Sequence, residues 1–145
     1  MGENHKAPDP INQPYVVEDV KGFPVVRIPF SKITSVQAPA LKALFTNMVR
    51  EGKKFIAVDL SKVEYIDSSA LSALLLGRRL TRDNDGVLVL FGLGGWAKKV
   101  IEVSELDKVF EIMDDEEQAV DYLILSQIRG ELQDGDSNSS DSQDS

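Results

Sequence analysis

The run Val87–Phe91, VLVLF, is apolar at every position, and no other feature of this 145-residue chain restricts the fold as much. A strand with one solvated face alternates apolar and polar residues, whereas a strand buried on both faces has no need to alternate. Turn residues bound the run, with Asn84-Asp85-Gly86 before it and Gly92-Leu93-Gly94-Gly95 after it. The run therefore predicts a buried strand of a parallel sheet.

The other elements alternate in type along the chain. Runs of β-branched and aromatic residues predict strands, and apolar residues at helical spacing predict helices. Strands are expected at residues 15–20, 24–30, 55–60 and 109–113, the first two joined as a hairpin, and helices at residues 41–49, 70–82, 96–103 and 115–128. The order β-β-α-β-α-β-α-β-α predicts an α/β fold with a mixed, mostly parallel five-stranded sheet and four helices.

The two ends of the chain differ in composition from the middle. Residues 1–14 contain three prolines and few apolar groups, and the last residues are acidic and rich in serine. Such segments bury too little apolar surface to offset the entropy of ordering. We therefore expect one domain at residues 15–128, a disordered N-terminal extension at residues 1–14 and a disordered acidic tail at residues 129–145.

Charge and composition exclude several functional classes. Of the net charge of −8, the segment from Gly130 onward carries −5, which leaves −3 for residues 1–129. No basic stripe marks a nucleic-acid surface. With no cysteine, a disulfide and a thiolate zinc site are impossible. No apolar run approaches the roughly 20 residues that span a bilayer, and no signal-peptide region is evident. These features predict a cytoplasmic protein without cofactors, direct nucleic-acid binding or membrane insertion.

Two rival kinds of site have little support. The only histidine, His5, lies in the N-terminal extension, so a Ser-His-Asp arrangement would have no base. Asp59 and Asp67 flank a predicted strand end and form a conceivable acid–base pair, but no second polar cluster accompanies them. The glycines at 92–95, followed by Lys98 and Lys99, are able to hold an anion but lack the spacing of a nucleotide-binding fingerprint. We therefore predict a binding protein and not an enzyme.

Trp96 opens the predicted helix at residues 96–103. A lone tryptophan at this position, with Val100 and Val103 on the same face, is typical of packing, whereas an exposed one would be able to stack on a ligand.

The junction Asp67-Ser68-Ser69 stands between a strand and an apolar helix. Aspartate and serine at such a place serve as helix N-caps. At about 100° per residue, the residues on one side of the helix fall within roughly 80° of one another. They are Ser68, Ser72, Leu75, Arg79 and Arg82. This side has the mixed polar and apolar character of a docking surface.

The opposite side of the helix is apolar and has several small residues. It carries Ala70, Ala73, Leu76, Gly77 and Leu80. We expect this side to pack against the sheet, which would leave the side with Ser68 exposed.

The segment VEYIDSSALSALLLGRR resembles the signature of the STAS family, specifically that of the bacterial anti-sigma factor antagonists. Their pattern is a hydrophobic residue, Asp, Ser, Ser or Thr, Gly, Leu, Gly and then an apolar helix. The resemblance extends over the predicted domain, because SVQAPALKALF is similar to the first helix and WAKKVIEVSELDKVFEI to the third helix and fifth strand. The resemblance implies the STAS fold.

The resemblance also implies a phosphorylation cycle known as partner switching. The unphosphorylated antagonist would bind an anti-sigma factor that is itself a serine kinase, and so free a sigma factor for transcription. Phosphorylation of the serine after the Asp, here Ser68, would end that binding, and a PP2C-type phosphatase would reset it. The predicted partner-binding residues are Asp67, Ser68, Ser69, Ser72, Leu75, Arg79, Arg82 and Thr34.

This sequence departs from the family pattern in two places. Residues 31–34 are Ser-Lys-Ile-Thr where the family has Gly, an acid, an apolar residue and Asp, and residues 70–72 are Ala-Leu-Ser in place of Gly-Leu-Gly. The first change leaves the identity of the partner open. A subunit of a stressosome, an accessory subunit of a membrane transport system and a nucleotide-binding STAS module are the alternatives.

Overall fold

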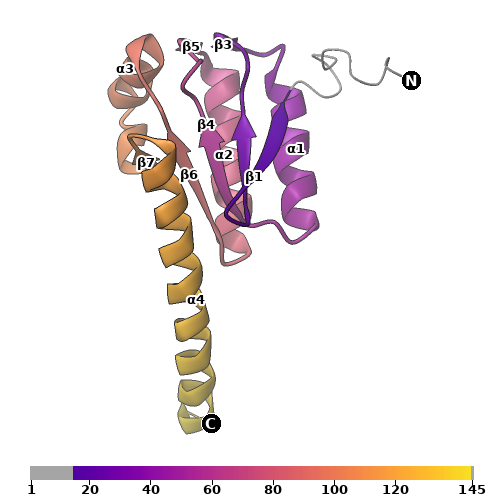
Figure 1. The fold of residues 1–145 in the computed structure, drawn as a ribbon, viewed down its shortest axis with the longest axis vertical. Helices are drawn as coiled ribbons and strands as arrows, with labels where there is room; N and C mark the ends of the chain where they lie inside the picture. Colours follow the sequence, from indigo (N-terminus) through magenta and orange to yellow (C-terminus); the bar gives the residue numbers. More distant parts are fainter. Residues whose placement is uncertain (1–14, 145) are drawn as a thin grey trace, which may run out of the picture.

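The computed structural model describes residues 15–144 and shows a five-stranded sheet between helices (Figure 1). Strand order is β1-β2-β4-β6-β7, with β1 antiparallel to β2 and all other neighbours parallel. The strands are β1 (Val16–Val20), β2 (Phe23–Arg27), β4 (Phe55–Asp59), β6 (Val87–Phe91) and β7 (Glu111–Met113). The mixed, mostly parallel sheet predicted from the sequence is confirmed.

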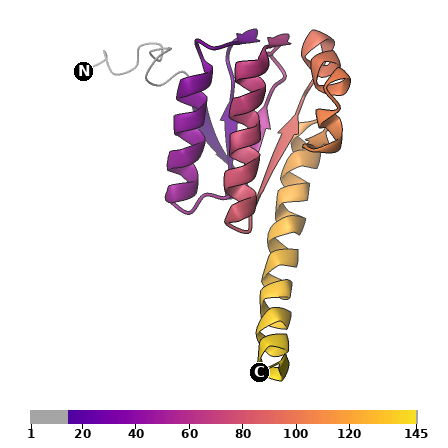
Figure 2. The same cartoon turned by 180° about the vertical axis from the view of Figure 1, so that it is seen from behind.

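Helices cover both faces of the sheet. They are α1 (Ala38–Arg50), α2 (Ser68–Asp83), α3 (Gly95–Val103) and α4 (Glu116–Asp144), with a short 3-10 turn at Leu106–Lys108. Seen from behind, α1 and α2 lie side by side across one face, and the first half of α4 covers the other (Figure 2).

The strand β6 is buried on both of its faces, as its sequence predicts. Leu88 and Leu90 point into the core beneath α1 and α2, whereas Val89 packs beneath α4, and none of the three is more than 1% exposed. The hydrophobic effect on both faces therefore fixes β6 as an inner strand.

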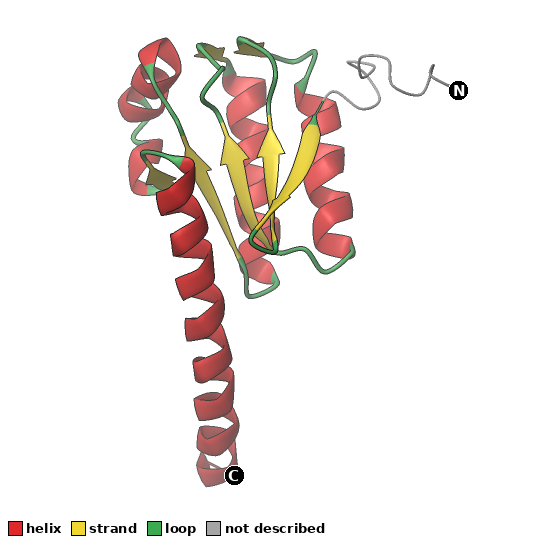
Figure 3. Ribbon diagram, in the orientation of Figure 1, coloured by secondary structure: helices red, strands yellow, loops and turns green. Residues whose placement is uncertain are grey.

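A second, two-stranded sheet was not predicted. It pairs β3 (Lys32–Ile33) with β5 (Tyr65–Ile66) in parallel, at the end of the molecule where the main parallel strands finish (Figure 3). Strands of two residues are too short to show an alternating pattern, and their pairing depends on two loops that only the fold brings together.

The last helix is longer than the sequence analysis predicts. It was expected to end near Ile128, with a disordered tail at 129–145, but α4 continues to Asp144 and extends beyond the sheet (Figure 1). No proline interrupts this segment, and Gly130 and Gly135 each cost only about 1 kcal/mol of helix stability relative to Ala. The predicted extension at residues 1–14 lies outside the described residues.

One face of α4 packs against the sheet, except at its end. Ala119, Val120 and Leu123 are buried against the sheet, whereas Ile128 is 47% exposed. Ile128 stands on the side of the helix that turns away from the sheet, because five residues after Leu123 the helix has turned by about 140° beyond a full turn.

A charged cluster ties the strands to α4. The guanidinium of Arg27 contacts Glu18 at 2.8 Å, Asp59 at 3.0 Å and Glu116 at 2.5 Å, and so connects β1, β2, β4 and α4. The other oxygen of Asp59 accepts hydrogen bonds from the backbone N–H and the hydroxyl of Ser61, at 2.9 and 2.6 Å. Asp59 therefore has a structural role, and its carboxylate is fully engaged.

Burial by itself raises the pKa of Asp59, but the hydrogen bonds from Ser61 and the guanidinium of Arg27 outweigh it and hold this pKa below its ordinary value. A carboxyl group with a lowered pKa in the folded state stabilises the protein above its unfolded-state pKa, near 4, and this contribution is lost as the pH falls through the folded-state pKa. We expect Asp59→Asn to be less stable than the wild type at pH 7 and the difference to shrink below about pH 4. Urea unfolding at pH 7, 5 and 3 measures the difference in the free energy of unfolding between the two proteins. A difference that is constant with pH would contradict this role of Asp59.

Candidate functional site

The candidate site is built around the first residue of α2, Ser68. The residue before it, Asp67, is the N-cap of the helix, and its carboxylate accepts a hydrogen bond from the N–H of Ala70 at 3.0 Å. Ser68 itself is exposed, and no described residue forms a hydrogen bond with its hydroxyl. Because the carboxylate of Asp67 already caps the helix, the hydroxyl of Ser68 is not needed for capping.

The paired strands β3 and β5 hold the segment of chain that leads into α2. The carbonyl of Ile33 accepts a hydrogen bond from the N–H of Asp67 at 3.2 Å, and the carbonyl of Ser31 accepts from Glu64 and Tyr65 at 2.7 and 3.0 Å. The segment at 31–34, which departs from the family pattern, therefore lies directly against the Asp67-Ser68-Ser69 junction.

Thr34 lies next to this pair but is engaged in the turn before α1. Its N–H and hydroxyl both donate to the side-chain oxygen of Gln37, at 2.9 and 3.1 Å, and its hydroxyl oxygen accepts from the N–H of Val36 at 3.2 Å. The residue is half-buried. The structure brings Thr34 to the same end of the molecule as Ser68 but gives its side chain an evident local role.

The predicted outward side of α2 is largely exposed. Ser68, Ser72, Arg79 and Arg82 are exposed, and Ser69 is half-buried. The prediction that Leu75 is exposed is wrong. Its side chain is half-buried and packs against the main core, so it does not form an exposed apolar contact in the middle of this side.

The small-residue side of α2 packs closely, but against a helix as well as the sheet. A Cβ atom added to Gly77 would lie 2.7 Å from the ring of Phe45 in α1. The absence of a side chain at Gly77 lets the two helices approach, and this contact orients α2 so that Ser68 and Ser72 face outward.

Large apolar side chains are exposed at this end of the molecule, and only Trp96 among them was considered from the sequence. Trp96, in the first turn of α3, is 59% exposed, so the expectation that it packs with Val100 and Val103 is wrong; Val103 is itself 77% exposed. Tyr65 in β5 is 38% exposed and Val36, just before α1, is 64% exposed. Helical spacing gives Trp96 and Val100 the same side of α3, but Val100 packs against the core whereas Trp96 is exposed.

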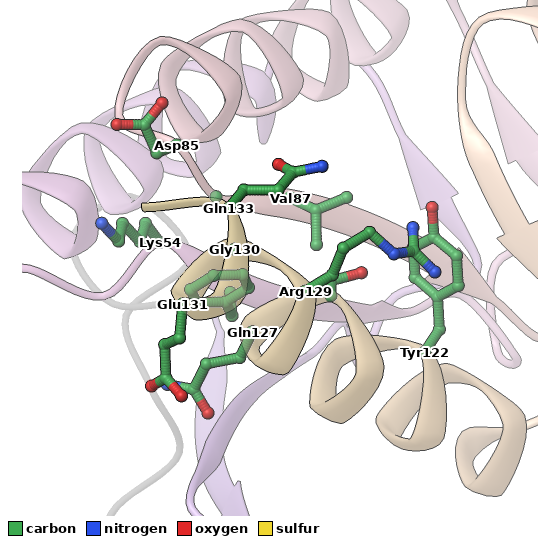
Figure 4. Close-up of a pocket in the computed structure, with 12 residues that line it drawn as sticks. Lys54, Asp85, Val87, Tyr122, Gln127, Arg129, Gly130, Glu131 and Gln133 are labelled. Atoms are coloured by element: carbon green, nitrogen blue, oxygen red, sulfur yellow. The ribbon is translucent and has the colours of Figure 1, made fainter. Parts of the chain in front are cut away.

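A separate cavity of about 390 Å³ lies at the opposite end of the sheet, beneath α4 (Figure 4). Its lining includes the cations Lys54 and Arg129, the anion Asp85 and the neutral phenol of Tyr122. Burial, followed by the charge of Glu111, raises the pKa of Tyr122. The cavity is formed where β4 and β6 begin, whereas α2 starts where the strands end, so it is not part of the Ser68 site.

Among residues 15–144, no helix combines the length and the apolar character that crossing a membrane requires.

Comparison with known proteins supports the fold and identifies the family. The STAS domain family matches residues 15–119. An anti-sigma-B factor antagonist of Listeria monocytogenes is 33% identical over 82 residues, which cover 56% of this chain and 71% of that protein. The crystal structure of an anti-sigma factor antagonist from Mycobacterium paratuberculosis superimposes with a TM-score of 0.64 at 27% identity, covering 75% of this chain and 92% of that one.

The phosphorylated form of the Bacillus cell fate determinant SpoIIAA has the same fold, with a TM-score of 0.60 at 22% identity, over 74% of this chain and 97% of that one. The Listeria and Mycobacterium proteins are named as antagonists of an anti-sigma factor, in agreement with the prediction of a regulatory protein and not an enzyme. The chain belongs to the STAS-domain family, and distant relatives such as the Listeria and Mycobacterium proteins are named anti-sigma factor antagonists.

Proposed function

We propose that this protein is an anti-sigma factor antagonist that acts in the cytoplasm by partner switching. In its unphosphorylated form it binds an anti-sigma factor with serine kinase activity, so that a sigma factor is released to direct transcription. Phosphorylation of Ser68 by that kinase ends the binding, and a PP2C-type phosphatase restores it. The observation that carries the proposal is the exposed hydroxyl of Ser68 beside a helix cap that Asp67 already provides.

The position of Ser68 suits a phosphate. Unpaired backbone N–H groups and the dipole at a helix N-terminus favour a negative charge, so the modified domain stays folded. The phosphate adds a charge of about −1.5 to −2 at pH 7. A partner surface that fits a neutral hydroxyl would have to desolvate this charge, at a cost of several kcal/mol.

The relatives support this cycle. The Listeria protein is named for antagonism of an anti-sigma-B factor, and SpoIIAA is known in an unphosphorylated and a phosphorylated form. In this chain, the exposed residues Ser72, Arg79 and Arg82 extend the proposed contact surface along α2. From Ser68 to Arg82 this surface is roughly 21 Å long, at 1.5 Å per helical residue.

Intact-mass spectrometry tests the modification. The protein is incubated with ATP and a purified serine kinase of the anti-sigma class from the same organism. Wild type and Ser69→Ala are expected to gain one phosphate, whereas Ser68→Ala gains none. Circular dichroism checks that both variants fold. A phosphate on Ser68→Ala, together with its absence from Ser69→Ala, would assign the modification to Ser69 instead.

A further inference from the structure

A hollow of about 440 Å³ opens between two loops at the end of the sheet where Ser68 lies. Glu64 lines it from the loop between β4 and β5, and Trp96 lines it from the start of α3. The remaining lining residues are Ser61, Val63, Gly92, Gly94 and Gly95. Glu64 is the only charged side chain among them; Lys98 and Lys99 are exposed on α3 but do not line the hollow.

The two loops are held in place. Gly92 has a φ of +81°, and a Cβ atom there would lie 3.0–3.1 Å from Ser61, so the loops meet where only glycine fits easily. The N–H of Leu60 donates to the carbonyl of Phe91 at 2.9 Å, just before both loops. The hollow is therefore formed in the free protein, and a partner that fills it does not have to order it first.

The hollow lies at the same end of the molecule as the Ser68 site. The loop that carries Glu64 runs directly into β5 and then into Asp67 and Ser68, and α3 contacts β5. A partner that covers Ser68 and the exposed Tyr65 would therefore extend over Trp96 as well.

The lining favours a cationic side chain with a flat shape. An exposed indole attracts a cation over its ring face, and a neighbouring carboxylate can pair with the same cation. Arginine fits both, because its planar guanidinium stacks on an aromatic ring and still presents hydrogen-bond donors at its edge. Tryptophan and arginine are also the residues that most often dominate the energy of protein interfaces.

We infer that this hollow is a binding subsite for an arginine side chain of the anti-sigma kinase, with Trp96 and Glu64 as its recognition residues. The inference rests on the proposed function, because it assigns a second contact to the same partner. Its effect is on affinity and does not depend on phosphate transfer.

Trp96 is the only tryptophan of the chain, so its fluorescence reports whether the hollow is occupied. Titration with the purified kinase, after subtraction of the emission of the kinase alone, is expected to move the emission of Trp96 to shorter wavelength. By isothermal titration calorimetry, Trp96→Ala should weaken binding about tenfold or more, and Trp96→Phe less. Glu64→Gln should weaken binding and reduce its dependence on salt.

Val103→Ala is the matched control, since Val103 is exposed at the far end of α3 and does not line the hollow. It should bind as the wild type does. Binding by Trp96→Ala within twofold of wild type, while Ser68→Asp has lost binding, would overturn the inference and leave the proposed function standing. If the wild type does not bind the kinase, both fail. Saturable quenching of Trp96 by ATP or GTP without the kinase would identify a nucleotide site instead and also overturn the inference.

Discussion

Ser68→Asp is expected to weaken binding of the anti-sigma kinase about a hundredfold while the melting temperature stays nearly unchanged. A hundredfold loss corresponds to about 3 kcal/mol, which is a moderate cost for desolvating a carboxylate at an interface. The fold should tolerate the change, because Ser68 is exposed at the first position of α2, where a negative charge interacts favourably with the helix dipole. Calorimetric titration and thermal unfolding measure the two effects on one preparation.

Ser104→Asp is the control for charge. It places the same carboxylate on an exposed serine at the C-terminal end of α3, so it should leave kinase binding unchanged and lower the melting temperature only slightly, because a negative charge there opposes the helix dipole. Equal affinity of Ser68→Asp and wild type would refute a switch at this residue. A large fall in the melting temperature of Ser68→Asp would show that the side chain matters for folding, contrary to its exposure.

Gly86→Ala is expected to destabilise the protein by about 3 kcal/mol and to lower its melting temperature by about 10 °C. A Cβ atom at Gly86 would collide with the carbonyl oxygen of Lys54 and approach the Cβ of Lys54 to 2.6 Å. That carbonyl accepts the N–H of Val87 at 2.9 Å, at the start of the pairing between β4 and β6. Because the collision is with backbone, no rotamer relieves it, and the two central strands have to separate.

Gly130→Ala provides the matched comparison, since the same atom is added where nothing lies within 4 Å. In the interior of α4, alanine favours the helix by up to about 1 kcal/mol, so this variant should be slightly more stable than the wild type. Urea unfolding of both variants measures whether each substitution lowers or raises the free energy of unfolding. A Gly86→Ala protein as stable as wild type would contradict the close packing of Gly86. A Gly130→Ala protein without added stability or helicity would contradict a helix that continues past Ile128.

Local sequence determined the regular elements and the place of Ser68. The apolar run Val87–Phe91 predicted a buried parallel strand because burial on both faces removes alternation, and the structure buries it on both faces. Asp67 before an apolar helix predicted a cap, and its carboxylate does accept the N–H of Ala70. These inferences succeed because they depend on residues that are close in the chain.

Tertiary structure alone decided which residues surround Ser68. The pairing of Ile33 with Ile66, the exposure of Trp96 and the partial burial of Leu75 all depend on segments that are distant in sequence. A helical wheel gives the direction of a side chain about its own axis, but not whether a neighbouring element covers it. Coverage depends on how far each strand and helix extends, and this is set by packing across the whole domain.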